Sequence, residues 1–136
     1  LVGSEMCIRD RVEKLEKIAL GAAEQSKRNF VPSIELFERK SDFLAQLDQF
    51  DRVVVAYEES AKEGESAALI QAVAGLEKGA KLLFIFGPEG GLSPAEIESF
   101  EVKGAVLAGL GPRILRAETA PLYSLSAISV LLELEK

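Results

Sequence analysis

The stretch KLLFIFGPEGGLSPAE, residues 81–96, indicates the fold of this chain most clearly. Its first part, Lys81 to Phe86, is a continuous apolar run of the kind that forms a strand buried in a parallel sheet. A glycine-rich turn follows, and Ser93 then provides an N-cap for a helix, with Pro94 at the first helical position and Glu96 completing a capping box. A strand that passes through a tight turn into a helix is the repeating unit of α/β folds.

Strand and helix patterns alternate along the rest of the chain. Apolar residues at helical spacing predict helices at residues 12–27, 42–47, 66–76 and 119–135, the last capped by Thr119, and β-branched, alternating or apolar runs predict strands at 33–37, 52–57 and 105–110. Residues 58–65 are expected to form a charged loop. We therefore predict an α/β fold with a mostly parallel sheet and flanking helices.

The composition limits what the chain can do. The length of 136 residues suffices for one domain, and no apolar run approaches the roughly 20 residues that a membrane-spanning helix needs. The absence of histidine excludes histidine triads and histidine zinc sites, and the single Cys7 excludes an internal disulfide or a thiolate cluster, so no metal is expected. The net charge of −6 makes the chain a poor nucleic-acid binder by itself, because phosphate contacts need Lys and Arg.

The first residues differ from the rest of the chain. Leu1 to Arg11, LVGSEMCIRDR, has neither the apolar region nor the cleavage site of a signal peptide and resembles a translated adapter sequence. We expect residues 1–11 to be a non-native leader and residues 12–136 to form the domain. The near absence of cysteine fits a cytoplasmic location.

Two loops follow predicted strands and are unusual in composition. In open parallel sheets, ligands bind at loops that leave the carboxyl ends of strands. The first loop, GPEGGLS at residues 87–93, has glycines that allow close approach to a ligand, and the helix behind it offers free backbone N–H groups. It is neither G-x-G-x-x-G nor a P-loop, which disfavours a conventional dinucleotide or P-loop nucleotide site. A tight turn without a ligand remains an alternative.

The second loop, LGPRILRAET at residues 110–119, carries two arginines in an acidic chain. Arg113 and Arg116 could hold a phosphate, while Ile114 and Leu115 could form an apolar wall for a purine. Alternatively, one arginine pairs with Glu118.

The segment EQSKRN, residues 24–29, has a similar ambiguity at the end of the first predicted helix. Lys27 and Arg28 either complement the helix dipole or form a small basic patch for RNA.

Together these segments resemble the 16S ribosomal RNA uridine-N3 methyltransferases of the RsmE type, in the SPOUT superfamily. Besides the two loops, KIALGAAEQSKRN at residues 17–29 is similar to that family's K-I-A-x-x-A-x-E-Q-x-x-R-N segment. The resemblance runs from about residue 12 to the C-terminus. It implies a SPOUT methyltransferase domain with a C-terminal trefoil knot, S-adenosylmethionine as cofactor, a homodimer, and 16S ribosomal RNA or the small ribosomal subunit as partner in the cytoplasm.

The resemblance also assigns site residues. The cofactor would be lined by Gly87, Pro88, Glu89, Gly90, Gly91, Leu110, Gly111, Ile114, Leu115 and Arg116. For catalysis, Arg28 or Arg116 would stabilise negative charge on the uracil carbonyls or position a phosphate. Glu89 would act as a base or hydrogen-bond the loop.

The chain departs from the family pattern in four places. The family's N-terminal RNA-binding barrel and the first strand and helix of its methyltransferase domain have no counterpart here, Lys27 stands where glycine is usual, and Ala117 stands where threonine is usual. We therefore expect the chain alone to be inactive or nearly so. Two alternatives remain open: a SPOUT enzyme that acts on another RNA site such as a ribose 2′-hydroxyl, and a non-catalytic α/β binding or dimerisation module.

Overall fold

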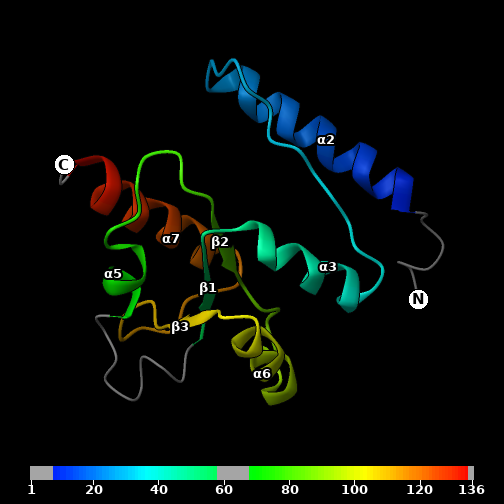
Figure 1. Ribbon diagram of the computed structural model, residues 1–136. Helices are drawn as coiled ribbons and strands as arrows, with labels where there is room; N and C mark the ends of the chain where they lie inside the picture. The colour runs from blue at the N-terminus through cyan, green and yellow to red at the C-terminus, as the bar shows by residue number, and fades with distance from the viewer. Residues whose placement is uncertain (1–7, 58–67, 135–136) are drawn as a thin grey trace. The chain divides into compact units, whose positions relative to one another are not determined.

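The computed structural model of the chain describes residues 8–57 and 68–134 and divides into two compact units, residues 1–42 and 43–136. The first unit contains the helix α2 (Ile8–Gln25), which begins four residues before the predicted start. Beyond the helix, the chain turns back along α2 (Figure 1). Residues 31–34 line a groove together with residues of α2.

The end of α2 is closed by a Schellman motif. The backbone N–H of Arg28 donates to the carbonyl oxygen of Ala23 at 2.8 Å, and that of Lys27 donates to the carbonyl oxygen of Glu24 at 3.1 Å. Lys27 has a φ of 58°, in the left-handed region that favours glycine. The position where the family usually has glycine is therefore one whose backbone conformation suits glycine.

The strand predicted at residues 33–37 is wrong. Residues 30–37 belong to no helix or strand. A strand needs a partner for its backbone hydrogen bonds, and the described strands pair only among themselves. Alternation of apolar and polar residues over so short a stretch does not supply that partner.

The second unit is built on a parallel sheet, as predicted. Its strands are β1 (Arg52–Ala56), β2 (Leu82–Ile85) and β3 (Val106–Ala108), in the order β2-β1-β3 (Figure 1). Both neighbours pair with β1 in parallel. Each strand lies within its predicted range and is shorter at the ends. The α/β fold predicted from the sequence is thus confirmed.

Helices cover both faces of the sheet. Val53 and Val55 point to one face, where they pack with α3 (Lys40–Gln46), the 3₁₀ helix η1 (Leu47–Gln49) and α6 (Pro94–Val102). On this face the rings of Phe43 and Phe100 meet edge to face, with their centroids 6.2 Å apart. Val54 points to the opposite face, toward α5 and α7. This alternation follows from the period of two residues in a strand.

The helices of the opposite face differ in detail from the prediction. The helix α5 (Ala68–Val73) ends three residues earlier than expected, just before Gly75 with its positive φ of 79°. The helix α7 (Thr119–Ser129) continues as a π-helical segment, η2 (Val130–Leu134). Its N-cap is Glu118, so the prediction that Thr119 caps the helix is wrong. The predicted charged loop at residues 58–65 lies outside the described residues.

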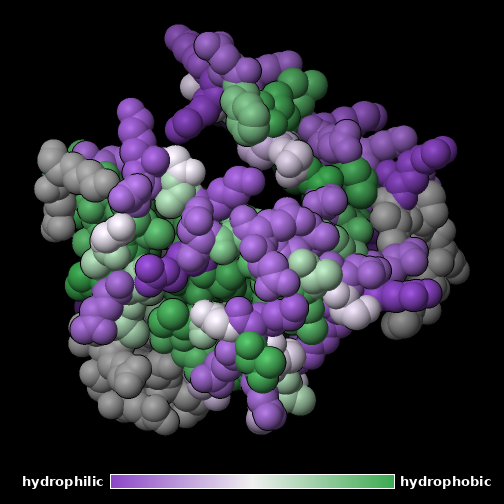
Figure 2. Space-filling model, viewed as in Figure 1, coloured by the Kyte–Doolittle hydropathy of each residue, from purple (hydrophilic) through white to green (hydrophobic). Residues whose placement is uncertain are grey.

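Polar side chains cover much of the face drawn in Figure 2, with apolar groups between them. Among the described residues, no helix is both long and apolar enough to cross a membrane.

Candidate functional site

The strand order places the two unusual loops at one end of the sheet. Because β2 and β3 both run parallel to the central β1, their carboxyl ends lie at the same edge. The glycine-rich loop at residues 87–93 follows β2, and the arginine-bearing loop at residues 110–119 follows β3. The end of β1 lies between these two exits.

The two loops share a cavity of about 420 Å³. Its lining residues come from the end of β1, the loops after β2 and β3, and the first turns of α6 and α7: Ala56, Tyr57, Phe86, Gly87, Pro88, Glu89, Gly90, Gly91, Leu92, Pro94, Leu110, Gly111, Arg113, Ile114, Leu115, Ala117 and Ala120. Every residue assigned to the cofactor from the sequence is in this set except Arg116. The structure therefore brings the predicted loops together.

The glycine-rich loop turns tightly on itself. The N–H of Gly91 donates to the carbonyl oxygen of Pro88 at 2.8 Å, and Gly91 has a φ of 80°. At Gly87 a Cβ atom would lie 2.9 Å from Cγ of Leu92, a distance that ordinary side chains do not reach. Glycine at position 87 is therefore required by the shape of the loop itself.

The predicted capping box fixes the far end of this loop. The N–H of Glu96 donates to Oγ of Ser93 at 3.1 Å, and the N–H of Ser93 donates to Oε1 of Glu96 at 3.0 Å. These two bonds satisfy backbone donors at the start of α6. The loop is thus held between the end of β2 and a helix with a defined first residue.

The arginine-bearing loop is closed differently. Gly111 has a φ of 92°, and the hydroxyl oxygen of Tyr123, on α7, lies 3.4 Å from where a Cβ of Gly111 would stand. The carbonyl oxygen of Arg116 accepts from the N–H groups of Thr119 and Ala120, at 2.9 and 3.0 Å. The start of the loop therefore lies close to Tyr123 of α7, and its end accepts hydrogen bonds from the first residues of that helix.

The two arginines of this loop have different surroundings. Arg113 lines the cavity, whereas Arg116 is absent from the lining residues among the part of the chain that the structure describes. The Arg116 side chain is 85% exposed, and its Nη1 lies 3.9 Å from Oε1 of Glu118. Such an exposed ion pair contributes little stability. The predicted apolar wall fits better, because Ile114 and Leu115 both line the cavity.

The remaining predicted catalytic residues lie in different units. Glu89 lines the cavity as an exposed residue of the glycine-rich loop. Arg28 belongs to the first unit, where its backbone N–H closes α2. The catalytic roles of Arg28, Glu89 and Arg116 stay predictions.

Sequence reasoning missed the contribution of the central strand. Ala56 and Tyr57 line the cavity at the end of β1, and Phe86 lines it at the end of β2. The signal was present, because Tyr57 lies two residues after the buried run Val53 to Val55. The order of the strands was not readable from the pattern, so nothing indicated which strand would end between the two loops.

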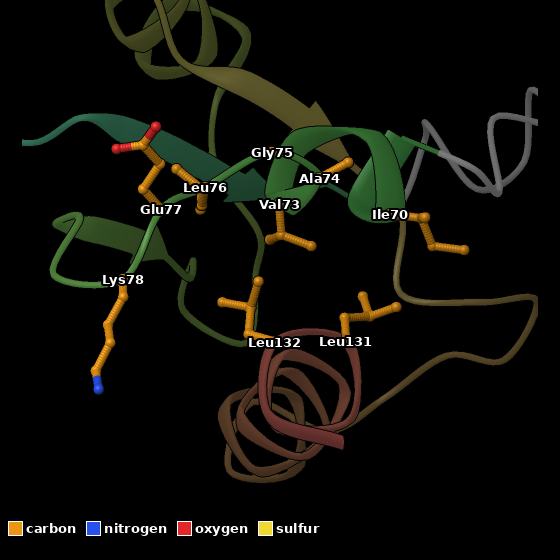
Figure 3. Close-up of a pocket in the computed structure, with 9 residues that line it drawn as sticks. All are labelled: Ile70, Val73, Ala74, Gly75, Leu76, Glu77, Lys78, Leu131 and Leu132. Atoms are coloured by element: carbon orange, nitrogen blue, oxygen red, sulfur yellow. The ribbon is translucent and has the colours of Figure 1, made fainter. Parts of the chain in front are cut away.

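A second cavity, of about 460 Å³, lies between α5 and η2 (Figure 3). Ile70, Val73, Leu131 and Leu132 line it with apolar groups, and the charged Glu77 and Lys78 come from the turn after α5. Its described lining residues include no convergent polar groups of the kind that orient a ligand. Within residues 8–57 and 68–134, no cluster of three acidic or cysteine side chains is positioned to hold a metal ion.

Comparison with known proteins shows the family of the chain. The family model for the RNA methyltransferase domain matches residues 3–129. The ribosomal RNA small subunit methyltransferase E of Bacillus subtilis is 53% identical over 122 residues, which cover 90% of this chain and 48% of the relative.

The chain belongs to the ribosomal RNA small subunit methyltransferase E (RsmE) family. It spans about half the length of the relatives that it matches. A crystal structure of a protein described only as hypothetical is similar with a TM-score of 0.83 and 48% identity, covering 94% of this chain and 49% of the other. The crystal structure of a ribosomal RNA small subunit methyltransferase E from Neisseria gonorrhoeae, bound to S-adenosyl methionine, has a TM-score of 0.68 and 28% identity over 90% of this chain and 48% of its own.

Proposed function

We propose that this chain is the cofactor-binding part of an enzyme that methylates N3 of a uridine in 16S ribosomal RNA with S-adenosylmethionine. The observation that carries the proposal is the single cavity formed by the glycine-rich and arginine-bearing loops. The S-adenosyl methionine bound by the Neisseria gonorrhoeae relative supports it.

The residues of the cavity fit such a cofactor. A volume of about 420 Å³ is in the range of small-molecule sites, roughly 300–1,000 Å³. Gly90 has open space where a side chain would stand, so a ligand can approach the backbone there. Ile114 and Leu115 offer apolar surface to a nucleoside, and Arg113 offers a cation to a carboxylate.

When bound, S-adenosylmethionine supplies an electrophilic methyl group on a sulfonium. The residues of the chain then have to align the uridine N3 with that methyl group, and alignment is the larger part of catalysis in such a displacement. Arg28 or Arg116 stabilises negative charge on the uracil carbonyls or positions a phosphate. Glu89, at the cavity, accepts the imide proton or hydrogen-bonds the loop.

A second copy of the chain is proposed to complete the enzyme as a homodimer. The side chains of Leu122 and Leu125 on α7 are each 66% exposed. They lie on the helix that carries the cavity residue Ala120, so a subunit docked there would stand near the site. Exposed leucines gathered on one helix are typical of a surface that another protein covers.

The RNA contact is assigned mainly to other parts of the enzyme. With a net charge of −6, this chain is not suited to hold a phosphate backbone by itself. We therefore expect the chain alone to bind the cofactor but to methylate RNA at most weakly, and the enzyme to act on the small ribosomal subunit in the cytoplasm.

Two measurements test the proposal. Isothermal titration of the 136-residue chain with S-adenosylmethionine should show one site, and a folded sample that binds none would favour a non-catalytic module. In the second, this chain replaces the matching half of the Bacillus subtilis relative in a strain that lacks that relative. Nucleoside mass spectrometry of its 16S ribosomal RNA should then detect 3-methyluridine. Methylation of a ribose 2′-hydroxyl instead would assign the chain to another RNA site.

A further inference from the structure

Tyr57 lies where the two loops meet. It directly follows β1, the central strand, and its N–H donates to the carbonyl oxygen of Ala108 at 3.0 Å, which extends the β1–β3 pairing by one bond. Its backbone is therefore held at the exit of the central strand, between the loops that follow β2 and β3. Tyr57 also lines the cavity that these loops share.

The direction of the Tyr57 side chain follows from the period of the strand. Val53, Val55 and Tyr57 alternate onto one face of the sheet, where Tyr57 is half-buried against the core cluster. Leu92, which contacts Gly87, packs against the same cluster. The ring therefore stands on the side of the glycine-rich loop, anchored by the core and partly open.

Among the described residues that line the cavity, two have aromatic side chains, Tyr57 and Phe86. The ring of Phe86 is already stacked on that of Phe84, with centroids 4.9 Å apart and planes 8° apart. No ring of the described residues stacks on Tyr57 in this way. Tyr57 thus offers a flat surface to a planar ligand group.

We propose that Tyr57 contacts the cofactor and sets its affinity by packing its ring against the adenine base. This inference rests on the proposed function, because it assumes that the cavity binds S-adenosylmethionine. Stacking of a base on an aromatic side chain is insensitive to hydrogen-bonding pattern and strong enough to change affinity about tenfold or more. The phenolic hydroxyl is not needed for it.

The chain offers an intrinsic probe for this contact. It has no tryptophan and two tyrosines, Tyr57 and Tyr123. In the Tyr123→Phe variant Tyr57 is the sole tyrosine, and its fluorescence should be quenched saturably by S-adenosylmethionine after correction for absorbance with free tyrosine amide. In Tyr57→Phe the remaining Tyr123 should respond much less. An equal response in the two variants would overturn the proposal.

Affinity measurements distinguish the contribution of the Tyr57 ring to binding from that of its hydroxyl and from any effect on folding. By isothermal titration, Tyr57→Phe should bind within threefold of the parent chain, and Tyr57→Leu should bind about tenfold more weakly. Phe50→Leu is the matched control, because Phe50 packs against the same cluster without lining the cavity. Tyr57→Leu should melt within a few degrees of this control, so that the lost affinity is not lost folding.

S-adenosylhomocysteine identifies the part of the cofactor involved. Because it keeps the adenine and lacks the sulfonium, Tyr57→Leu should weaken its binding by the same factor. A loss confined to S-adenosylmethionine would contradict the adenine contact, and so would unchanged affinity of Tyr57→Leu for both ligands. If the parent chain itself binds neither ligand, the proposed function fails, whereas binding that ignores Tyr57 overturns this inference alone.

Discussion

Gly87 and Leu92 approach each other so closely that a Cβ atom on Gly87 would lie 2.9 Å from Cγ and 3.2 Å from the backbone nitrogen of Leu92. A flexible side chain can move aside, but a backbone nitrogen cannot do so without displacing the loop. The glycine-rich loop of the cavity is thus closed by its own first and sixth residues.

This relationship predicts different effects of the same substitution at two glycines. Gly87→Ala should lower the melting temperature and weaken S-adenosylmethionine binding, because the loop has to open to make room for the alanine side chain. Gly90→Ala should melt like the parent chain, since a Cβ there meets no atom within 4 Å. Scanning calorimetry and isothermal titration measure both effects. Equal melting temperatures for the two variants would contradict the prediction.

Replacing Lys27 by glycine is predicted to stabilise the first unit. Lys27 is in the left-handed region, where a residue other than glycine destabilises the folded state by about 1–2 kcal/mol. Replacing it by glycine removes this strain, but part of the gain is lost because glycine has a greater conformational entropy in the unfolded chain. Lys27→Gly should therefore stabilise the end of α2 by about 0.5–1 kcal/mol. Hydrogen exchange of amides in the last turns of α2 should slow severalfold. Lys14→Gly, in the exposed middle of the helix, should instead speed exchange, and faster exchange in Lys27→Gly would refute the explanation.

Replacing Ser124 by alanine is predicted to stabilise the second unit. Its side chain is 1% exposed, and its Oγ has no hydrogen-bond partner among the described residues. A buried hydroxyl without a partner costs about 1–3 kcal/mol, so Ser124→Ala should raise the melting temperature by several degrees. Ser126→Ala has the same helix-propensity gain at an exposed position of α7 and should change it less. A lower melting temperature for Ser124→Ala would show that the hydroxyl is satisfied in solution.

The exposed leucines of α7 predict the assembly state. If a second copy covers this helix, replacing Leu122 and Leu125 by Glu should shift the chain from dimer to monomer in analytical ultracentrifugation, because two charges would be buried without partners. Val102→Glu is the control, since Val102 is also an exposed apolar side chain, at 80%, but lies on α6. A parent chain that sediments as a monomer at high concentration would argue against the homodimer.

The elements that the sequence predicted well are those with local signals. The strand before Gly87 and the helix after Ser93 were predicted nearly to the residue, because an apolar run, a glycine turn and a capping box each act over a few residues. The strand predicted at residues 33–37 failed for the opposite reason. Whether an alternating stretch becomes a strand depends on a distant partner, which the local pattern does not contain.

The candidate site was predictable in part for the same reason. Both loops were found from composition, and the topology of parallel strands brought them together. The position of Tyr57 at the cavity could not be predicted without the strand order. The different positions of Arg113 and Arg116 could not be predicted without the path of the loop. The trefoil knot stays a prediction from the resemblance, since local periodicity carries no information on threading.

The strand β1 connects the core to the cavity, because Val55 is fully buried and Tyr57, two residues later, lines the cavity. A ligand bound in the cavity should therefore stabilise the whole second unit. At a concentration of a hundred times its dissociation constant, it should raise the free energy of unfolding by roughly 2.7 kcal/mol. A dye-based thermal scan of the isolated chain would then suffice to find inhibitors, with neither ribosomes nor radioactive methyl donor in the assay.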